Sequence, residues 1–402
     1  MIHKLYTADI VLPGPAGESV TDGAVLVEGE TITAVGPRTE IEKQAAPGTP
    51  VENFHGGTIL PGIVNSHIHL VFHGGPKPAD VLQSESDDSR LVLKMAARAN
   101  TLLRSGVTTA RDLGDRDGLA LRVRDAIAAD EIPGPRILAA TTPLTPPQGH
   151  CWFLGGEVSG EHEIRARIQH LASRGADAIK IMASGGESTP GPYAMWDPQF
   201  TTEELRAAVD EAHGAGLTVA AHAHSAEGVA RVVDAGVDTV EHATWLVAGP
   251  DWDPRPEVAQ QMAEQGTILC HASSNDWRRL AAVAGEDWAR RLGGRVAWFD
   301  SFGVTQIAGT DAGITSFGDS PAALARFADY GFTPARAIEI GTVAGATALG
   351  LAGTTGALRA GLAADLLIVQ GNPLVDLTAL TNTLRVVARG HQYTPEQAEP
   401  DR

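Results

Sequence analysis

Cysteine is scarce in this 402-residue chain, which has only Cys151 and Cys270. The two do not form a CxxC pair, so a disulfide framework is not expected. No apolar run reaches the roughly 18 residues that a membrane span needs. The first residues, MIHKLYTADIVLPG, also lack the long apolar core of a signal peptide. We therefore expect a cytoplasmic protein with no membrane partner.

Basic residues are also few. The chain has 31 Lys and Arg and 49 Asp and Glu, which gives a net charge of −18. This balance argues against nucleic acid or an anionic membrane as the partner. The content of 43% hydrophobic and 20% charged residues is typical of a globular protein with a large core. The length allows one large barrel or two to three ordinary domains.

The two ends of the chain have the pattern of short strands broken by turns. GAVLVEGETITAVGP alternates like a hairpin near the N-terminus, and AADLLIVQGNPL and LRVVARGH have the same pattern near the C-terminus. We expect residues 1–57 and 354–402 to form one small β domain.

Between these ends, residues 58–353 alternate short apolar strands with helical segments. ADAIKIMAS precedes TTEELRAAVDEAHGAG, for example, and LTVAAHAHS precedes AEGVARVVDAG. About eight such units predict an α/β fold, a (β/α)8 TIM barrel with its site at the carboxyl ends of the strands.

Histidines and carboxylates follow several of these predicted strands. His67 and His69 share a face of the first strand because alternate strand residues point the same way. A lone histidine is more often a structural residue, but a set at the same end of strands 1, 5, 6 and 8 is hard to assign to packing. Imidazole and carboxylate together suit Zn²⁺ and similar ions. The other members are His222, His224, His242 and Asp311.

Lys180 lies in the middle of the predicted fourth strand, where an unpaired charge is costly. Burial lowers the pKa of a lysine and makes the amine neutral and nucleophilic. A neutral amine can add CO2 and become a carbamate, an anion whose two oxygens can bridge two cations. The alternative is a buried Lys–Asp ion pair.

Six segments together resemble the amidohydrolase superfamily, particularly its imidazolonepropionase-like and prolidase-like branch. They are LPGIVNSHIHL, GADAIKIMASGG, VAAHAHS, VEHAT, GTDAG and GALRAGLAADLLIVQGNPL. The resemblance spans nearly the whole chain and implies a (β/α)8 barrel with a small β-sandwich domain built from both termini.

The resemblance also implies a site with two divalent metal ions, which we expect to be zinc. His67 and His69 would bind the more buried ion, and carboxylated Lys180 would bridge both ions. The second ion would be bound by His222 and His242, while His224 would contact substrate, although the choice between His222 and His224 stays open. Asp311 would bind the buried ion and move protons, so the expected catalytic residues are Asp311, Lys180 and His242.

Other polar residues near the strand ends have expected roles of their own. Glu241 would orient a ligand, and Asp112 would be structural. His150, in the loop after the third strand, would contact substrate as a histidine in this loop does in relatives. His271 would face the pocket or pack.

Aromatic residues make up only 5% of the chain, yet several tryptophans lie in predicted loops after strands. Tyr193 and Phe153 belong to the same predicted rim, where Arg278 and Arg279 could meet a substrate carboxylate. This rim favours a neutral or monoanionic substrate with a bulky apolar or aromatic group, unless the tryptophans only pack loop against loop. The tryptophans are Trp152, Trp196, Trp245, Trp252 and Trp277.

These features predict a hydrolase that cleaves a C–N amide bond of a small-molecule substrate by a metal-bridging hydroxide. The first interpretation is a dipeptidase or N-acyl-amino-acid hydrolase. The alternative is a ring-opening hydrolase of a lactam, imidazolone or imide, although Lys180 counts against the one-metal imidazolonepropionases. A non-enzymatic scaffold is disfavoured because the ligand set is complete, and the choice between a monomer and a homo-oligomer stays open.

Overall fold

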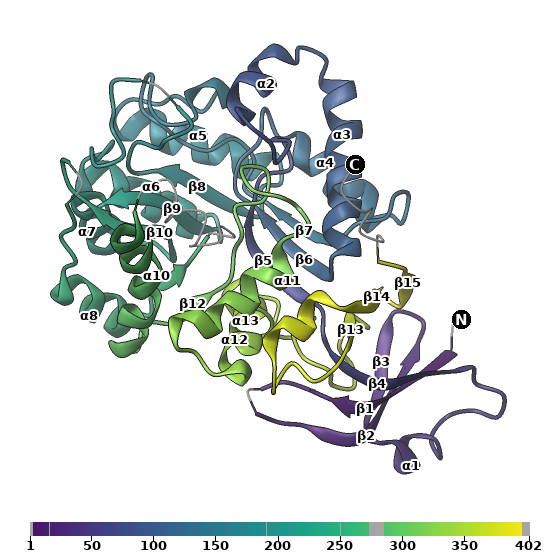
Figure 1. The fold of residues 1–402 in the computed structure, drawn as a ribbon. Coiled ribbons are helices and arrows are strands. Elements are labelled where there is room, and N and C mark those ends of the chain that lie inside the picture. Colours follow the sequence, from purple (N-terminus) through teal and green to yellow (C-terminus); the bar gives the residue numbers. More distant parts are fainter. Residues whose placement is uncertain (1–2, 16, 190, 250, 273–284, 396–402) are drawn as a thin grey trace.

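The computed structural model describes residues 3–15, 17–189, 191–249, 251–272 and 285–395. The two ends of the chain meet in one seven-stranded sheet, drawn in purple and yellow in Figure 1. The strand order is β15-β14-β13-β4-β1-β2-β3, with β4 parallel to β1 and antiparallel to β13. The strands are β1 (His3–Val11), β2 (Val20–Glu28), β3 (Thr31–Pro37), β4 (Val51–Pro61), β13 (Leu366–Gln370), β14 (Thr383–Ala388) and β15 (His391–Tyr393).

Apolar side chains from both ends hold this sheet together. Tyr6, Val25 and Ile59 belong to one buried cluster with Ile368 and Val387, which come from the far end of the sequence. Both ends of the chain thus contribute strands to a single sheet, while their division into a separate domain stays a prediction. The sandwich arrangement stays a prediction.

The described residues between the ends include eight further strands, and all their ladder pairs are parallel. They form a three-stranded sheet with the order β5-β6-β7 and a five-stranded sheet with the order β12-β11-β10-β9-β8. The strands are β5 (Ile63–Ile68), β6 (Val107–Asp112), β7 (Arg136–Ala139), β8 (Ala178–Met182), β9 (Thr218–Ser225), β10 (Thr239–Leu246), β11 (Ile268–Cys270) and β12 (Gln306–Ile307).

Helices follow the parallel strands, as the α/β prediction requires. No helix within the described ranges is both long and apolar enough to cross a membrane. The α-helices are α1 (Arg38–Ile41), α2 (Pro78–Ser84), α3 (Asp88–Arg104), α4 (Leu119–Ala128), α5 (Gly160–Ser173), α6 (Thr202–Gly214), α7 (Ala226–Ala235), α8 (Pro256–Gln265), α10 (Glu286–Ser301), α11 (Ser320–Ala325), α12 (Pro334–Ile340) and α13 (Val343–Ala348). The 3₁₀ helices are η1 (Trp152–Leu154), η2 (Arg326–Tyr330) and η3 (Leu377–Thr381).

Isolated parallel bridges connect the two parallel sheets at both margins. Leu144, beyond the end of β7, pairs with Ile181 of β8. Ile68 of β5 pairs with Ala312, which follows β12. The end of β8 therefore lies beside the segment that follows β7, and the end of β5 lies beside the segment that follows β12, although the latter two are far apart in the sequence.

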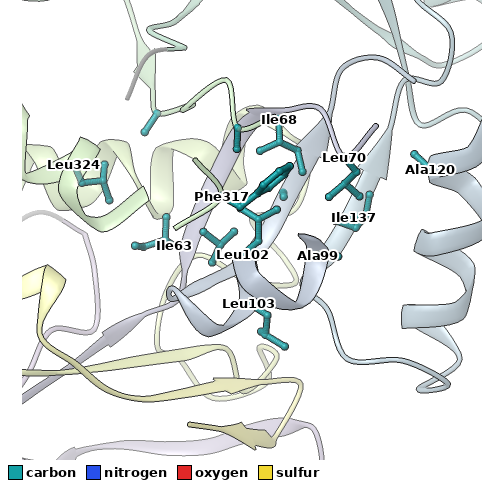
Figure 2. Packing of buried hydrophobic residues seen from close by; sticks show 14 of the residues in the cluster. Ile63, Ile68, Leu70, Ala99, Leu102, Leu103, Ala120, Ile137, Phe317 and Leu324 are labelled. Atoms are coloured by element: carbon teal, nitrogen blue, oxygen red, sulfur yellow. The ribbon is translucent and has the colours of Figure 1, made fainter. Parts of the chain in front are cut away.

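Helix α3 shows how the sequence pattern builds the core behind β5. Its buried residues recur every three to four positions, so one face of the helix is apolar. Asp87 caps its first turn by accepting hydrogen bonds from two backbone amides. Figure 2 shows Leu102 and Leu103 of this helix in the same cluster as Ile63 and Ile68 of β5. The cluster thus joins the helix to the strand that carries His67 and ends one residue before His69.

Candidate active site

His67, His69 and Asp311 meet at the carboxyl end of β5. The Nε2 atoms of the two histidines lie 3.2 Å apart, and each is 3.4 Å from Oδ1 of Asp311. A tetrahedral ion with bonds of about 2.0–2.1 Å separates its ligand atoms by roughly 3.3–3.4 Å. The spacing of the three side chains is therefore compatible with one metal ion.

Hydrogen bonds on the far side of each ring fix which nitrogen faces this point. His67 Nδ1 lies 2.6 Å from Oε2 of Glu241, and His69 Nδ1 lies 3.1 Å from the Gly114 carbonyl oxygen. Both partners are acceptors, so each Nδ1 donates away from the site and each Nε2 faces Asp311. The orienting role expected of Glu241 agrees with this geometry.

The backbone at Asp311 is in the left-handed region, with φ of 57°. A non-glycine residue pays roughly 1–2 kcal/mol for this conformation, and a turn in which Ile314 and Thr315 donate to the Asp311 carbonyl holds it. Burial would raise the pKa of the carboxyl, but the hydrogen bond and charge of His67, with His69 and Lys180, lower it to about 2. Asp311 is therefore an anion at neutral pH.

A second group consists of His222 and His224 on β9 and His242 on β10. Their ring centroids are 4.6–4.8 Å apart. His224 Nδ1 lies 2.9 Å from the Thr244 hydroxyl, and His222 Nε2 lies 3.2 Å from the Gly185 carbonyl. Each ring keeps its other nitrogen for a ligand, so both candidates for the ligand on β9 remain within this group.

Lys180 occupies the centre of β8 and is 1% exposed. Within the described part of the chain, its Nζ has no hydrogen-bond partner, so the structure does not contain the alternative Lys–Asp ion pair. Burial is the main cause that lowers the pKa of this amine. A buried polar atom without a partner is costly, and this one is available for carboxylation.

The two groups are adjacent, because the rings of His67 and His242 have centroids 5.1 Å apart. Burial is the main cause that lowers the pKa of His69 in the first group and of His222 in the second, and Lys180 contributes to the lowering of both. The amine therefore lies within electrostatic reach of both groups.

His150 lies beside the second group, as its expected role requires. Its ring centroid is 4.6 Å from that of His222, and the side chain is buried. Gln199 Oε1 accepts a hydrogen bond of 2.7 Å from its backbone amide and ties the loop after β7 to the loop after β8. Burial, followed by the charge of Lys180, lowers the pKa of His150 to about 4, so the ring is neutral near pH 7.

The predicted aromatic rim is present only in part. Trp152 and Trp196 are 39% and 40% exposed, and Tyr193 and Trp252 are half-buried. Phe153 packs against Phe72 and Trp152. Three residues predicted for the same rim lie outside the described residues, namely Trp277, Arg278 and Arg279.

The prediction for Trp245 is wrong. Strand β10 continues to Leu246, so Trp245 is part of the strand and is fully buried. Its ring stacks on Phe299 with centroids 5.6 Å apart, and its edge meets Trp298 of the same helix, α10. It belongs to the core, because the strand is longer than the motif VEHAT indicated.

Asp112 has the structural role expected of it. Its two oxygens accept hydrogen bonds from Leu70 and Gly114, at 2.7 and 3.1 Å. This joins the loops after β5 and β6 and so places the carbonyl that holds His69. His271, for which two roles were open, packs against Phe327 and Tyr330.

The sequence reasoning missed two buried arginines. Arg111 of β6 pairs with Glu241 at 2.9 Å. Arg295 of α10 donates to the backbone carbonyls of His242 and His271 at 2.9 and 3.2 Å. The signal for Arg111 was present, because a charged residue inside an apolar strand is the same anomaly that drew attention to Lys180.

Comparison with known proteins agrees with this geometry. The profile of the Amidohydrolase family matches residues 58–286 and 295–392. A profile described as the imidazolonepropionase-like composite domain of bacteria matches residues 23–46. The chain belongs to the Amidohydrolase family, and its fold is an α/β fold with parallel sheets. It is a hydrolytic enzyme acting on carbon–nitrogen bonds, in a family that is generally metal-dependent.

Individual relatives are similar over most of their length. An ochratoxinase from Aspergillus niger is 27% identical over 92% of this chain and 82% of its own. A Xaa-Pro dipeptidase, solved with methionine bound in its active site, is 26% identical, with a TM-score of 0.85 over 98% of this chain and 100% of its own. A putative prolidase from Bifidobacterium longum is 29% identical, with a TM-score of 0.79 over 100% of this chain and 96% of its own.

Proposed function

We propose that this enzyme is a binuclear metal-dependent hydrolase that cleaves the amide bond of a dipeptide or N-acyl-amino acid with an apolar or aromatic group. The observation that carries the proposal is the pair of ligand groups beside the unpartnered amine of Lys180. One group alone would suit a single-ion enzyme. An amine that can become a bridging carbamate favours two ions.

The residues of the first group, His67, His69 and Asp311, would hold one ion. His242, with His222 or His224, would hold the second, and carboxylated Lys180 would join the two. We expect zinc, because imidazole and carboxylate oxygen are its usual donors. When bound, such ions polarise a carbonyl and lower the pKa of water.

The protein's own groups account for the remaining chemistry. Asp311 is anionic, and its side chain is still 19% exposed, so it can accept a proton at Oδ and deliver it to the leaving nitrogen. His150 is neutral and lies against His222 of the second group, where it can donate to a substrate carbonyl or carboxylate. Whichever of His222 and His224 does not bind the ion would contact the substrate beside His150.

The positions of these residues are explained most simply if β5 to β12 close into a (β/α)8 barrel. The bridges at Leu144–Ile181 and Ile68–Ala312 support closure at both margins. In such a barrel the carboxyl ends of all the strands face one site. We propose residues 58–353 as this barrel and residues 1–57 with 354–402 as the terminal domain.

An apolar substrate group is supported by two exposed rings and by one relative. Trp152 and Trp196 lie in the loops that follow β7 and β8, and both expose about two fifths of their surface. The similar Xaa-Pro dipeptidase holds methionine, an apolar amino acid, in its active site. The match to the imidazolonepropionase-like domain keeps a cyclic amide as the second candidate.

The test of substrate class compares hydrophobic and cationic substrates that share one scissile amide, with cyclic amides in a parallel panel. We expect the highest kcat/KM for linear hydrophobic substrates, and higher KM in Trp152→Ala and Trp196→Ala. Val375→Ala removes an exposed apolar side chain (80% exposed) from the terminal region and is the control. A preference for Arg or Lys side chains, or an unchanged KM in both tryptophan variants, would refute the proposed pocket.

The test of the metal centre is metal analysis after loading the protein with excess Zn²⁺. We expect close to two ions per chain. Reproducible saturation at one ion with full activity would refute the binuclear mechanism while leaving amide hydrolysis intact.

A further inference from the structure

Arg111 is a charged side chain within a fully buried strand. It lies on β6, is 1% exposed and has three hydrogen-bond acceptors around it. Its Nε donates to the Ser66 carbonyl at 2.8 Å, its Nη1 to the Thr239 hydroxyl at 3.3 Å and its Nη2 to Oε1 of Glu241 at 2.9 Å. Burying a guanidinium this deeply is costly unless it is partnered, and here each of its three nitrogens donates to one acceptor.

The Glu241 carboxylate is shared between this arginine and a proposed metal ligand. Oε1 accepts from Arg111 and, at 2.6 Å, from the Thr239 hydroxyl. Oε2 lies 2.6 Å from Nδ1 of His67. Arg111, Glu241 and His67 thus form a continuous chain from β6 through β10 to β5, and neither carboxylate oxygen faces solvent.

Arg111 supplies the positive charge beside this buried carboxylate. Its guanidinium and the Thr239 hydroxyl both donate to Oε1, which leaves Oε2 for His67. The 2.6 Å contact with Oε2 directs Nδ1 of the His67 ring toward Glu241 and Nε2 toward His69 and Asp311.

We propose that Arg111 is a positioning residue of the metal centre, which acts through Glu241 to hold the His67 ring with Nε2 toward His69 and Asp311. The inference rests on the proposed function. It adds a residue outside the ligand set that sets the affinity of the first ion. Arg111 also contacts the carbonyl of Ser66, the residue before His67, so it locates the backbone as well as the ring.

The test is a double-mutant cycle read by metal binding, with Arg111→Met, Glu241→Gln and the double variant. Binding of Zn²⁺ and of Co²⁺ alone is measured by competition with a chelator, so no substrate is needed. We expect binding at one of the two sites to weaken about 10- to 100-fold in each single variant, the usual effect of losing a group that orients a ligand. If Arg111 acts through Glu241, the double variant binds no more weakly than Glu241→Gln.

Conservative and matched variants separate positioning from folding. Arg111→Lys keeps the charge without the planar fork and should recover part of the affinity. Arg136→Met is the control, because Arg136 on the neighbouring strand pairs with buried Asp365 at 2.8 Å and contacts no ligand. Its metal affinity should equal that of the wild type.

Three results would overturn the inference. The first is that Arg111→Met binds metal as tightly as the wild type. The second is that the losses of affinity in the two single variants add up in the double variant. The third is that neither Arg111→Met nor the double variant folds, as judged by near-UV circular dichroism of the metal-free proteins. In each case, two ions bound by the wild type would leave the proposed function standing. A wild type that binds no metal would refute the proposed function itself.

Discussion

Lys180 has no compensating partner among the described residues, although it is among the largest fully buried side chains. An ammonium in this place would cost several kcal/mol without a counter-charge. Burial avoids that cost by lowering the pKa of the amine, which is also the condition for reaction with CO2.

We predict that Lys180→Ala loses both metal and activity, because the bridge between the two ligand groups is gone. Short carboxylic acids should restore part of each by supplying two oxygens in the space left. Metal analysis and kcat, with and without the added acid, measure the effect, and Lys43→Ala at an exposed position is the control. Full metal content in Lys180→Ala would show that the lysine bridges nothing.

A substitution at Asp311 tests the proton transfer separately from the bridge proposed for Lys180. Asparagine keeps the size and one oxygen of the side chain but cannot accept a proton, so we predict that Asp311→Asn lowers kcat by about 10²-fold or more. Some metal should remain, because His67 and His69 are intact. Metal content is measured on the same sample, and near-normal kcat would assign the proton transfer to another group.

At the scale of elements, the loops after β7 and β8 form one wall of the site. Gln199 binds the backbone amide of His150 and the carbonyl of Met182, at 2.7 and 2.6 Å. Gly186 leaves the space that the His150 ring fills, because a Cβ at this position would overlap the ring. The position of His150 is thus decided by the neighbouring loop.

We predict that Gly186→Ala raises KM several-fold with a smaller effect on kcat, because the added methyl displaces His150 and leaves the proposed metal ligands in place. Steady-state kinetics on the best linear amide checks this. Gly214→Ala, where a Cβ would meet nothing within 4 Å, is the matched control. An unchanged KM in Gly186→Ala would remove His150 from the list of substrate contacts.

At the scale of the whole molecule, buried histidines make stability depend on pH. Burial is the main cause that lowers the pKa of His69 and His224 to about 3 and that of His150 to about 4. In the unfolded chain these groups titrate near 6.5. Between about pH 6.5 and 4 the unfolded state therefore binds more protons, and the free energy of unfolding falls as the pH falls.

We accordingly predict that the Tm of the metal-free protein decreases steadily from pH 7 to pH 5. His150→Gln should flatten this dependence, because one buried group no longer titrates on unfolding. His162→Gln, at an exposed position, should leave it unchanged. A Tm that is constant or higher at pH 5 would contradict the prediction.

The sequence by itself determined the alternation of strands and helices and the residues that carry the chemistry. These are local features, because a strand end, an HxH pair or a lysine inside an apolar run can be recognised within a few residues. The resemblance to the amidohydrolase superfamily, which rested on such segments, is confirmed by the family match.

Only the tertiary structure decided which of these residues meet. The 3.4 Å approach of Asp311 to His67 and His69, the contact of Arg111 with Glu241 and the burial of Trp245 all join segments far apart in the chain. Such contacts depend on how strands pair and where each strand ends. The local pattern around Trp245 is equally compatible with a strand or a loop, so only its packing against α10 could place it in the core.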